Sequence, residues 1–324
     1  MKAKIVSTAS YLPEKVLSNA DLEKLVDTTD EWITSRTGMK ERRLAADDEF
    51  TSNMGTKAAK LAMERAGLES KDVDLILVAT LTPDYMFPST ACLIQRELKA
   101  ENAAAMDFQA ACSGYIYGLS IAKGYIQAGM YKNIILIAAE KLSAIVDYED
   151  RGTSILFGDG ASACVISSEG SGLEIDAVTL GADGNLAEIL IMPAGGVRNP
   201  ASKETVENRD HYIKMEGREV FKHAVRRMEA ASQKCVEISG VDEIHWLVPH
   251  QANIRIIEVL AKRFKIPMEK VFLTIHKYGN TSASSVGIAL DELLNEKKIE
   301  KGENILLPAF GAGLTWGAAL LTKE

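Results

Sequence analysis

Short apolar runs alternate with longer amphipathic stretches along the first half of the chain. The runs are bounded by turn residues, as buried strands are, and the stretches between them carry apolar positions at helical spacing. The apolar runs are 74–80, 104–108, 133–139 and 161–167. The helical stretches are 53–66, 90–98 and 114–128. This alternation predicts an α/β fold with a mainly parallel sheet.

The second half of the chain repeats this order in a nearly fixed register. The segments that align at an offset of 170 residues are 77–78 with 247–248 and 135–137 with 305–307. The helical pattern at 256–264 falls opposite 90–98, with a slip of a few residues. Apolar runs can match by chance, but two strands and a helix in one register favour an internal duplication. We therefore predict two halves, residues 1–170 and 171–324, with the boundary near 168–175.

The repeated register places polar side chains at equivalent positions. At the same offset, Cys112 falls on Ser282 and Thr80 falls on His250. His250 follows an apolar strand, and open α/β sheets bind their ligands beyond the carboxyl ends of the strands. If the halves pack about a pseudo-twofold axis, Cys112, His250 and Asn280 converge on one site.

Cys112 separates a predicted strand from a predicted helix. A thiol at a helix N-terminus lies at the positive end of the helix dipole, which favours the thiolate. The small neighbours that permit a sharp turn and the close approach of a carbonyl group are Ala110, Ala111, Ser113 and Gly114. The alternative is a buried structural cysteine, the commonest state of a free cysteine. We expect that state for Cys92, Cys164 and Cys235.

His250, Asn280 and the turn after residue 307 each allow two interpretations. A histidine at a strand end can be a structural hydrogen-bonding group or a catalyst. Asn280 opens a run of small residues before the predicted helix 286–294, so it can cap that helix or donate an N–H to an oxyanion. The segment 310–317 is too short for a phosphate-binding loop, but its backbone N–H groups can be directed at a carbonyl oxygen.

Composition and charge exclude several classes of protein. The 324 residues are 47% hydrophobic and 25% charged, as in a globular protein rather than a disordered or fibrous one. The 37 Lys and Arg against 45 Asp and Glu give a net charge of −8, which argues against broad nucleic-acid binding. We find no signal peptide, membrane-spanning run or zinc-type cysteine spacing. We expect a cytoplasmic protein with reduced thiols, no metal, and no membrane or nucleic-acid partner.

Segments along essentially the whole chain resemble the thiolase superfamily, and most closely the β-ketoacyl-[acyl-carrier-protein] synthase III family. The matching segments are 28–33 (TTDEWI), 36–38 (RTG), 41–43 (ERR), 87–88 (FP), 111–114 (ACSG), 157–160 (FGDG), 249–253 (PHQAN), 279–283 (GNTSA) and 314–317 (LTWG). Cysteine, histidine and asparagine in these settings are specific, because elongating ketosynthases carry two catalytic histidines and thiolases carry a second cysteine. The chain departs from its relatives at Ser113 and Ser284, where alanine is frequent, and at Ala312, where glycine is frequent.

The resemblance implies an α/β fold of two βαβαβαββ halves packed as a five-layer αβαβα sandwich. It also implies a decarboxylating Claisen condensation of a short acyl-CoA with malonyl-acyl-carrier protein. The product is a β-ketoacyl-acyl-carrier protein, and the reaction initiates type II fatty-acid biosynthesis. Acyl-CoA is then a substrate, no cofactor is required, and the enzyme is a homodimer with acyl-carrier protein as its partner.

The family's functional residues match positions in this chain. Cys112 resembles the nucleophile that is acylated, while His250 and Asn280 resemble donors that stabilise the enolate formed on decarboxylation. The backbone N–H groups that match the oxyanion hole are those of Cys112, Ala312 and Gly313. The positions that match CoA contacts are Thr28, Trp32, Arg36, Arg151, Gly217 and Asn253. Phe87 matches the residue that closes the acyl pocket from across the dimer interface.

An acidic carrier protein requires a local basic surface on this negatively charged chain. Arg255 and Lys262 are seven residues apart and share a helix face, and Lys222 and Arg226 are spaced i,i+4 on the predicted helix 219–232. A solvated helix face is the alternative. The positions that we predict for docking are Gln251, Ala252, Asn253, Ile254, Arg255, Lys222 and Lys262. Such a patch acts mainly on the association rate and its salt dependence.

Three other functions remain open at the level of the sequence. A related synthase can use malonyl-CoA or make a specialised product. A Cys/His/Asn hydrolase shares the residue types, but it would hydrolyse acyl-CoA without a malonyl thioester. An acyl-CoA-binding protein without activity would leave the three polar residues unexplained.

Overall fold

A computed structural model of the protein describes residues 1–324, and its largest feature is one nine-stranded mixed sheet. The strands follow the order β11-β12-β13-β8-β1-β7-β6-β4-β5, so β5 and β11 form the edges. The strands of this sheet are β1 (Lys4–Tyr11), β4 (Leu75–Ala79), β5 (Ala104–Phe108), β6 (Asn133–Glu140), β7 (Gly160–Ser167), β8 (Leu173–Ala182), β11 (Trp246–Leu247), β12 (Asn304–Gly311) and β13 (Thr315–Lys323).

The first half of the chain follows the predicted alternation. β4 pairs in parallel with β5 and β6, and β7 pairs antiparallel with β6 and β1. The helices between these strands are α3 (Thr51–Ala66), α4 (Thr90–Leu98) and α5 (Gly114–Gln127), each within two residues of its prediction. Leu75 and Leu77 face one hydrophobic core while Ile76 and Val78 face another. Because both faces of the sheet are buried, its strands read as continuous apolar runs.

The second half repeats this order with one reduction. Its helices are α8 (Gly217–Ser239), α9 (Ile254–Arg263) and α11 (Ser284–Glu296). β11 and β12 are parallel, β12 and β13 are antiparallel, and β13 pairs with β8. The counterpart of β5 is only an isolated parallel bridge between Leu247 and Val271. The βαβαβαββ order is therefore present twice, with the third strand of the second copy shortened to this bridge.

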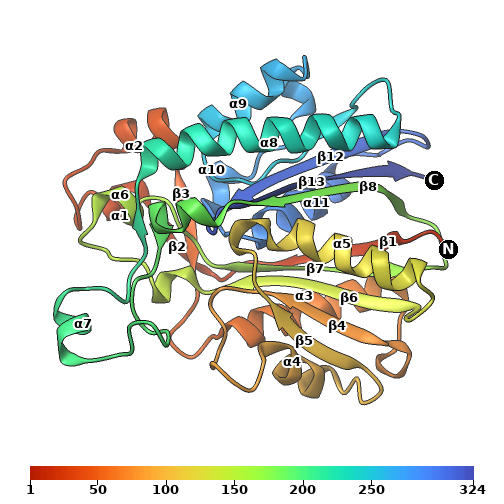
Figure 1. Cartoon of the computed structure of the whole chain (residues 1–324), viewed down its shortest axis with the longest axis horizontal. Coiled ribbons are helices and arrows are strands. Elements are labelled where there is room, and N and C mark those ends of the chain that lie inside the picture. The colour runs from red at the N-terminus through yellow and green to blue at the C-terminus, as the bar shows by residue number, and fades with distance from the viewer.

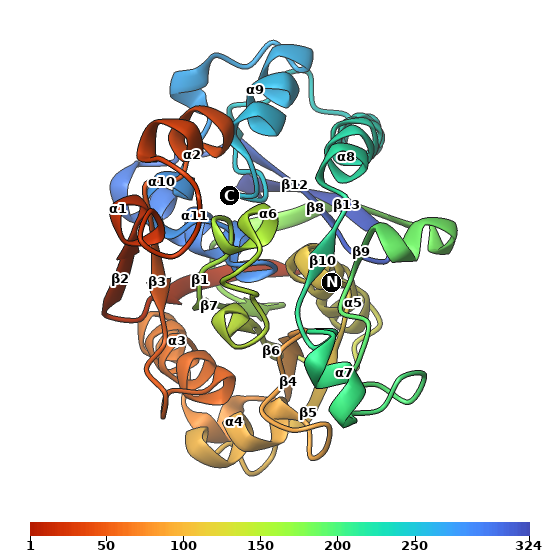
Figure 2. The same ribbon diagram turned by 90° about the vertical axis from the view of Figure 1, so that its left-hand side faces the viewer.

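The elements stack in five layers (Figures 1 and 2). α3 and α4 cover one outer face, α5 and α11 lie in the middle, and α8 and α9 cover the opposite outer face. Each of the three helical layers buries its own hydrophobic cluster against the adjoining strands. This arrangement confirms the αβαβα sandwich.

The strands of the two halves are joined edge to edge, so they form one sheet rather than two separate sheets. β1 pairs with β8 only through Lys4–Glu174 and Ile5–Leu173, and elsewhere the layer of α5 and α11 separates the halves. The boundary that we predict at residue 170 falls in the connection between β7 and β8. The division into domains 1–170 and 171–324 stays a prediction.

Short elements gather at one end of the sandwich (Figure 1). They are β2 (Lys15–Ser18), α1 (Asn19–Leu22), α2 (Asp30–Thr37), β3 (Glu41–Leu44), α6 (Arg151–Ser154), β9 (Leu190–Ile191), α7 (Lys203–Glu207), β10 (Lys214–Met215) and α10 (Ile275–Tyr278). The 3-10 helices are η1 (Ser70–Asp72), η2 (Ala111–Ser113), η3 (Leu142–Ala144), η4 (Gly184–Ile189) and η5 (Met268–Lys270). None of the helices combines the length and apolar character that crossing a bilayer requires.

Candidate active site

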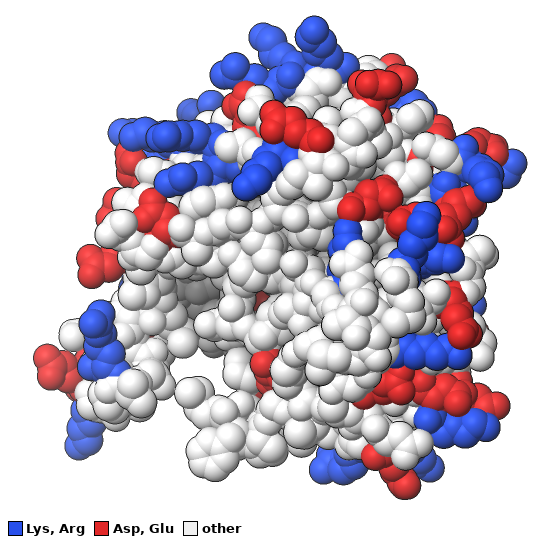
Figure 3. All heavy atoms as spheres, turned by 45° about the vertical axis from the view of Figure 1, so that its right-hand side comes forward, with Lys and Arg blue, Asp and Glu red and all other residues white.

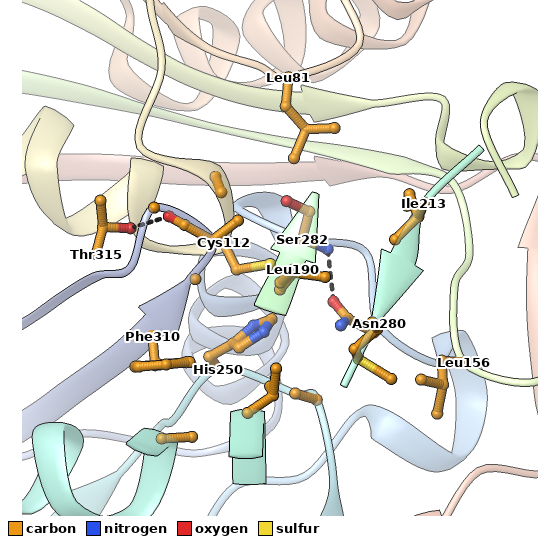
Figure 4. Close-up of a pocket in the computed structure, with 18 of the residues that line it drawn as sticks. Leu81, Cys112, Leu156, Leu190, Ile213, His250, Asn280, Ser282, Phe310 and Thr315 are labelled. Atoms are coloured by element: carbon orange, nitrogen blue, oxygen red, sulfur yellow. Dashed lines mark hydrogen bonds between the residues drawn. The ribbon is translucent and has the colours of Figure 1, made fainter. Parts of the chain in front are cut away.

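One cavity of about 530 Å³ lies where the two halves meet. Cys112, His250 and Asn280 all line it, and their side chains approach one another from separate elements (Figure 4). Of its 31 lining residues, 22 are hydrophobic, which suits an alkyl chain better than a charged substrate. The structure thus brings together the three residues that the repeated register places at one site.

The turn that carries Cys112 is held by both halves of the chain. It leads from β5 through η2 into α5, with Ala111 in the left-handed region at φ +44°. The Thr315 hydroxyl donates a hydrogen bond to the Ala110 carbonyl at 2.8 Å. Gly311 packs so closely that a Cβ there would lie 2.6 Å from the Cys112 nitrogen. Any side chain at position 311 would therefore displace the turn.

The Cys112 thiol is almost fully buried, at 8% exposure. Burial raises its pKa to about 12, and the negative charge of Glu140 adds to the rise, while the nearby Ser282 hydroxyl opposes it. The N-terminus of α5 acts in the opposite direction and favours the thiolate, as expected from the sequence. That Cys112 reacts as a thiolate stays a prediction.

The other cysteines divide by location. Cys164 and Cys235 are buried, as expected for structural residues, but Cys92 is exposed on α4. Our expectation that Cys92 is a buried core residue is wrong, because it lies on the outer side of its helix. None of the three lines the cavity.

His250 is a hydrogen-bond donor to the cavity. Its Nδ1 lies 2.7 Å from the Ser285 hydroxyl oxygen, which also accepts the backbone N–H of Gln251 at 3.3 Å. Nδ1 is the only acceptor within reach of the Ser285 O–H, so this O–H donates to Nδ1 and the ring proton resides on Nε2. Burial lowers the pKa of His250 to about 4, so the ring is neutral at physiological pH. A neutral ring in this tautomer presents an N–H and has no free acceptor nitrogen.

Asn280 is fixed so that its amide NH2 group is free. Its backbone N–H donates to the Leu156 carbonyl at 2.9 Å, and its own carbonyl accepts from Gly158 at 3.0 Å. Its side-chain oxygen accepts the Ser282 backbone N–H at 2.8 Å (Figure 4). α11 begins at Ser284 without a side-chain cap, so Asn280 is not the helix cap that the sequence left open.

The predicted oxyanion turn lies beside the thiol. Ala312 and Gly313 line the cavity with Cys112, directly after the close contact made by Gly311. The Ala312 carbonyl oxygen lies 3.0 Å from the Thr315 hydroxyl oxygen and is the second acceptor that its single proton can reach. The turn is therefore tied to the same residue that holds the nucleophile turn.

The predicted CoA contacts fall into one group near α2 and another group that lines the cavity. The Arg151 guanidinium carbon is 5.1 Å from the centre of the Trp32 ring, and Arg151 donates to the Asp27 carbonyl at 3.1 Å. This contact brings two residues that are far apart in sequence onto one surface. Gly217 and Asn253 line the cavity at the starts of α8 and α9.

The remaining predicted CoA residues lie near α2. Thr28 has a buried hydroxyl without a hydrogen-bond partner, and Arg36 is exposed in the last turn of α2. α2 ends at Gly38, where φ is +82° and a Cβ would lie 2.8 Å from the Cβ of Ile254. A glycine at this position therefore lets α2 pack directly on the start of α9, next to Asn253.

The predicted docking residues divide into exposed and buried groups. Lys222, Arg255 and Lys262 are exposed, and Lys and Arg side chains gather over α8 and α9 at the top of Figure 3. The Arg255 guanidinium carbon lies 5.7 Å from the Phe221 ring, which links the two helices. Ala252, Asn253 and Ile254 are half-buried.

Gln251 is a wrong prediction as a docking residue. Its side chain is fully buried. It donates to the Pro249 carbonyl at 2.7 Å and accepts the backbone N–H groups of Thr274 and Ile275 at 3.0 and 3.1 Å. These bonds fix the loop that carries His250, so the residue is structural and out of reach of a partner.

Phe87 does not line the cavity of its own chain. It is 86% exposed, and its neighbours Tyr85 and Met86 are 61% and 81% exposed. The chain therefore does not use Phe87 to close its own acyl pocket. The interpretation that it reaches across a dimer interface stays a prediction.

The sequence analysis did not identify three residues near the Cys112 thiol and the His250 imidazole. Ser285 sets the His250 tautomer, Ser282 lies next to Cys112, and Glu140 ends β6 with no exposed surface. Two signals were present. Ser282 is the counterpart of Cys112 at the offset of 170, and Glu140 is a carboxylate directly after an apolar strand.

Comparison with known proteins agrees with this site. A family model described as 3-oxoacyl-[acyl-carrier-protein (ACP)] synthase III matches residues 106–184, and the model of its C-terminal part matches residues 239–323. The β-ketoacyl-[acyl-carrier-protein] synthase III of Chlamydia pneumoniae is 58% identical over 325 residues, covering 99% of this chain and 97% of that protein. That of Caldanaerobacter subterraneus subsp. tengcongensis is 54% identical, covering 98% and 97%.

A solved structure extends the agreement to three dimensions. The crystal structure of 3-oxoacyl-[acyl-carrier-protein] synthase III from Aquifex aeolicus matches with a TM-score of 0.90 and 50% identity, covering 99% of both chains. Both the resemblance and the fold class inferred from the sequence are confirmed. The chain belongs to the β-ketoacyl-[acyl-carrier-protein] synthase III family, the condensing acyltransferases of fatty-acid synthesis.

Proposed function

We propose that this enzyme condenses a short acyl-CoA with malonyl-acyl-carrier protein through an acyl-Cys112 intermediate, giving a β-ketoacyl-acyl-carrier protein. The observation that carries this proposal is the convergence of a thiol, an imidazole N–H and a free amide NH2 on one apolar cavity. A nucleophile and two donors are the groups that acyl transfer followed by decarboxylation requires.

In the first half-reaction, Cys112 sulfur attacks the thioester carbonyl and the bond from that carbon to CoA sulfur breaks. Negative charge develops on the carbonyl oxygen in the transition state. The backbone N–H groups of Cys112 and of the turn at Ala312 and Gly313 are the donors that we assign to it. Removing one such donor typically costs about 10²–10³ in rate.

In the second half-reaction, the malonyl group loses CO2 and its thioester becomes an enolate. His250 Nε2–H and the Asn280 amide donate to the enolate oxygen. The carbanion then attacks the acyl carbon. The bond from that carbon to the Cys112 sulfur breaks, which restores the free enzyme. A neutral imidazole suits this role, because it donates without placing a positive charge in an apolar site.

We assign CoA binding to the predicted residues near α2 and at the cavity. Stacking of the CoA adenine on Trp32 and Arg151 uses the flat faces of both groups. The exposed cations Lys222, Arg255 and Lys262 would attract an acidic carrier protein. We further propose a cytoplasmic homodimer in which the exposed Phe87 closes the pocket of the partner subunit.

Mass spectrometry tests the intermediate. The protein is incubated with acetyl-CoA and digested, and we expect one acetyl group on the peptide containing Cys112. Malonyl-acyl-carrier protein should then discharge it and yield the β-ketoacyl product, whereas malonyl-CoA should not replace the carrier. The absence of an adduct on a thiol that iodoacetamide still alkylates would overturn the proposal. Release of free acetate without malonyl thioester would indicate a hydrolase instead.

A further inference from the structure

Arg42 is a fully buried cation in β3. Its hydrogen bonds go to neutral oxygen atoms rather than to a carboxylate. Nε donates to the Ile155 carbonyl at 2.9 Å, Nη2 donates to the same oxygen, and Nη1 donates to the Asn19 side-chain oxygen at 2.5 Å. Burial lowers the pKa of Arg42 to about 10, so it stays charged at neutral pH. A buried charge without an adjacent counter-ion is costly, so the places of its two partners matter.

The first partner, the Ile155 carbonyl, ends the helical turn that carries Arg151. α6 spans only Arg151–Ser154, and Ile155 is its C-terminal cap. At the other end of the turn, the Asp150 carboxylate accepts the Gly152 N–H at 2.8 Å. Because the helix is a single turn, fixing its last carbonyl also fixes the backbone from which the Arg151 side chain starts.

The second partner, Asn19, connects Arg42 to the helix that carries Trp32. Asn19 is buried, and its amide NH2 group donates to Asp30 Oδ1 at 2.7 Å and to the Met39 carbonyl at 2.9 Å. Asp30 is the first residue of α2, and Met39 lies two residues past its end. Asn19 therefore holds both ends of α2 while its oxygen accepts from Arg42.

These two connections lead to the two sides of the predicted nucleotide site. α1, α2, β3 and α6 lie at the same end of the sandwich (Figure 1). Arg151 and Trp32 face each other there, with the guanidinium carbon 5.1 Å from the ring centre. The bond from Arg151 to the Asp27 carbonyl is exposed to solvent, whereas the bonds of Arg42 are buried. Buried hydrogen bonds are stronger electrostatically than exposed ones, so the connection through Arg42 is the firmer of the two.

The aliphatic stem of Arg42 packs separately from its guanidinium group. A Cβ at Gly158 would lie 3.2 Å from the Arg42 Cβ, and a Cβ at Gly279 would lie 3.0 Å from its Cγ. Gly158 donates its N–H to the Asn280 carbonyl, so the stem lies against the backbone that holds Asn280. A methionine at position 42 keeps the Cβ and Cγ and removes only the N–H donors. The two contributions of Arg42 can therefore be tested apart.

We propose that Arg42 is a positioning residue that holds Trp32 and Arg151 at the spacing that binds the nucleotide end of CoA. It touches neither the substrate nor the reacting atoms. This inference rests on the CoA site in the proposed function. An acyl-CoA carries an adenine nucleotide, whereas a carrier-protein thioester has none. Arg42 therefore serves the first half-reaction and not the second.

Single-turnover acylation by two thioesters tests this role. Acetyl-pantetheine has the thioester arm of acetyl-CoA without the nucleotide. Arg42→Met should raise the acetyl-CoA concentration for half-maximal acylation about tenfold, because hydrogen bonds from a charged group are lost, and leave the maximal rate unchanged. Calorimetry should show the same weakening for CoA alone. Acylation by acetyl-pantetheine, and the reaction of acetylated enzyme with malonyl-acyl-carrier protein, should stay at the wild-type rate.

Asn19→Asp is a second variant, which decides the case if Arg42→Met fails to fold. Its carboxylate gives Arg42 a counter-ion, so the buried charge is kept and paired. It loses the N–H donors to Asp30 and to the Met39 carbonyl, and thus the connection to α2. We expect the same loss for acetyl-CoA and none for acetyl-pantetheine.

Arg43→Met is the matched control. It removes the same charge from the next position of β3, on the opposite face, where Arg43 donates to the Pro13 carbonyl at 3.3 Å. We expect it to bind acetyl-CoA like the wild type. Unchanged use of acetyl-CoA by Arg42→Met, equal losses with both thioesters, or an equal loss in Arg43→Met would overturn the positioning role. A wild-type protein that forms no acetyl-Cys112 would instead contradict the proposed function.

Discussion

The two halves of this molecule place different side chains at equivalent positions around one cavity. The pairs related by the offset of 170 are Thr80 and His250, Cys112 and Ser282, and Glu140 and Phe310. Each pair lies at the end of equivalent strands or at the start of equivalent helices. The first half supplies the nucleophile to the cavity, and the second supplies the imidazole, a hydroxyl and an apolar wall, whereas Thr80 and Glu140 are buried and do not line it.

This difference shows how a duplicated backbone supports one reaction. The repeat supplies two helix starts and two sets of strand ends facing one space, which is a matter of topology. The chemistry depends on the two copies not being alike, because the proposed reaction needs a thiol together with N–H donors rather than a second thiol. Neither half alone contains the complete set.

The largest effect is expected when substitutions of Cys112 and of its counterpart Ser282 are compared. Cys112→Ala should lower β-ketoacyl product formation by at least about 10⁴-fold, because the covalent route is lost. Ser282→Ala should keep the same route and be merely slower. Product formation followed by mass spectrometry measures both variants. Equal losses in the two variants would show that the thiol has no role distinct from its counterpart.

The next largest effect is expected when substitutions of His250 and of its counterpart Thr80 are compared. His250→Ala should lower condensation by about 10²–10³-fold, because one enolate donor is lost, while Cys112 still acylates. Thr80→Val removes one of the hydrogen bonds to Glu140 and should cost less than about tenfold. Separate assays of acetylation and of malonyl decarboxylation measure the two steps. Unimpaired decarboxylation in His250→Ala would remove it from the mechanism.

A stability measurement examines the burial of His250 directly. Its pKa is about 4 in the folded protein against an ordinary value of 6.5, so the unfolded chain binds the proton first as the pH falls. Between pH 7 and pH 4, the wild type should lose about 3 kcal/mol of unfolding free energy relative to His250→Gln. Urea unfolding at both pH values measures this difference. The same pH dependence in both proteins would show that the ring is not desolvated.

The smallest effect concerns the basic surface, which the second half carries on α8 and α9. Arg255→Glu should weaken the carrier-protein step by about tenfold, more at low salt, and leave acylation by acetyl-CoA unchanged. Lys234→Glu makes the same charge change farther along α8, on an exposed residue that does not line the cavity. Steady-state kinetics with varied carrier protein compares them. Equal weakening in both variants would reduce the effect to net charge.

Local patterns predicted the elements and the three main site residues well. The buried strands and the helices α3, α4 and α5 could be placed because both faces of the sheet are apolar and the helices are amphipathic. Cys112, His250 and Asn280 could be placed together because the repeat fixes which strand ends are equivalent. These features follow from local patterns of residues and from the repetition of those patterns along the chain.

Features that depend on distant segments could not be predicted. Gln251 is in the same motif as His250, but its burial depends on Phe272, Thr274 and Ile275, which lie more than 20 residues away. The protonation states have the same origin, because the pKa values of Cys112 and His250 follow from burial by the opposite half. The third strand of the second half shrinks to a bridge at Val271 without a clear sign in the sequence.

The place of β13 in the sheet has a consequence for how the protein is made. Residues 315–323 are synthesised after the other eight strands of the sheet, yet they lie inside it between β8 and β12, and Thr315 holds the turn before Cys112. A nascent chain that ends at residue 300 already carries Cys112, His250 and Asn280 but lacks the wall and the clamp that make them a site. The site can therefore assemble only after β12 and β13 have been synthesised.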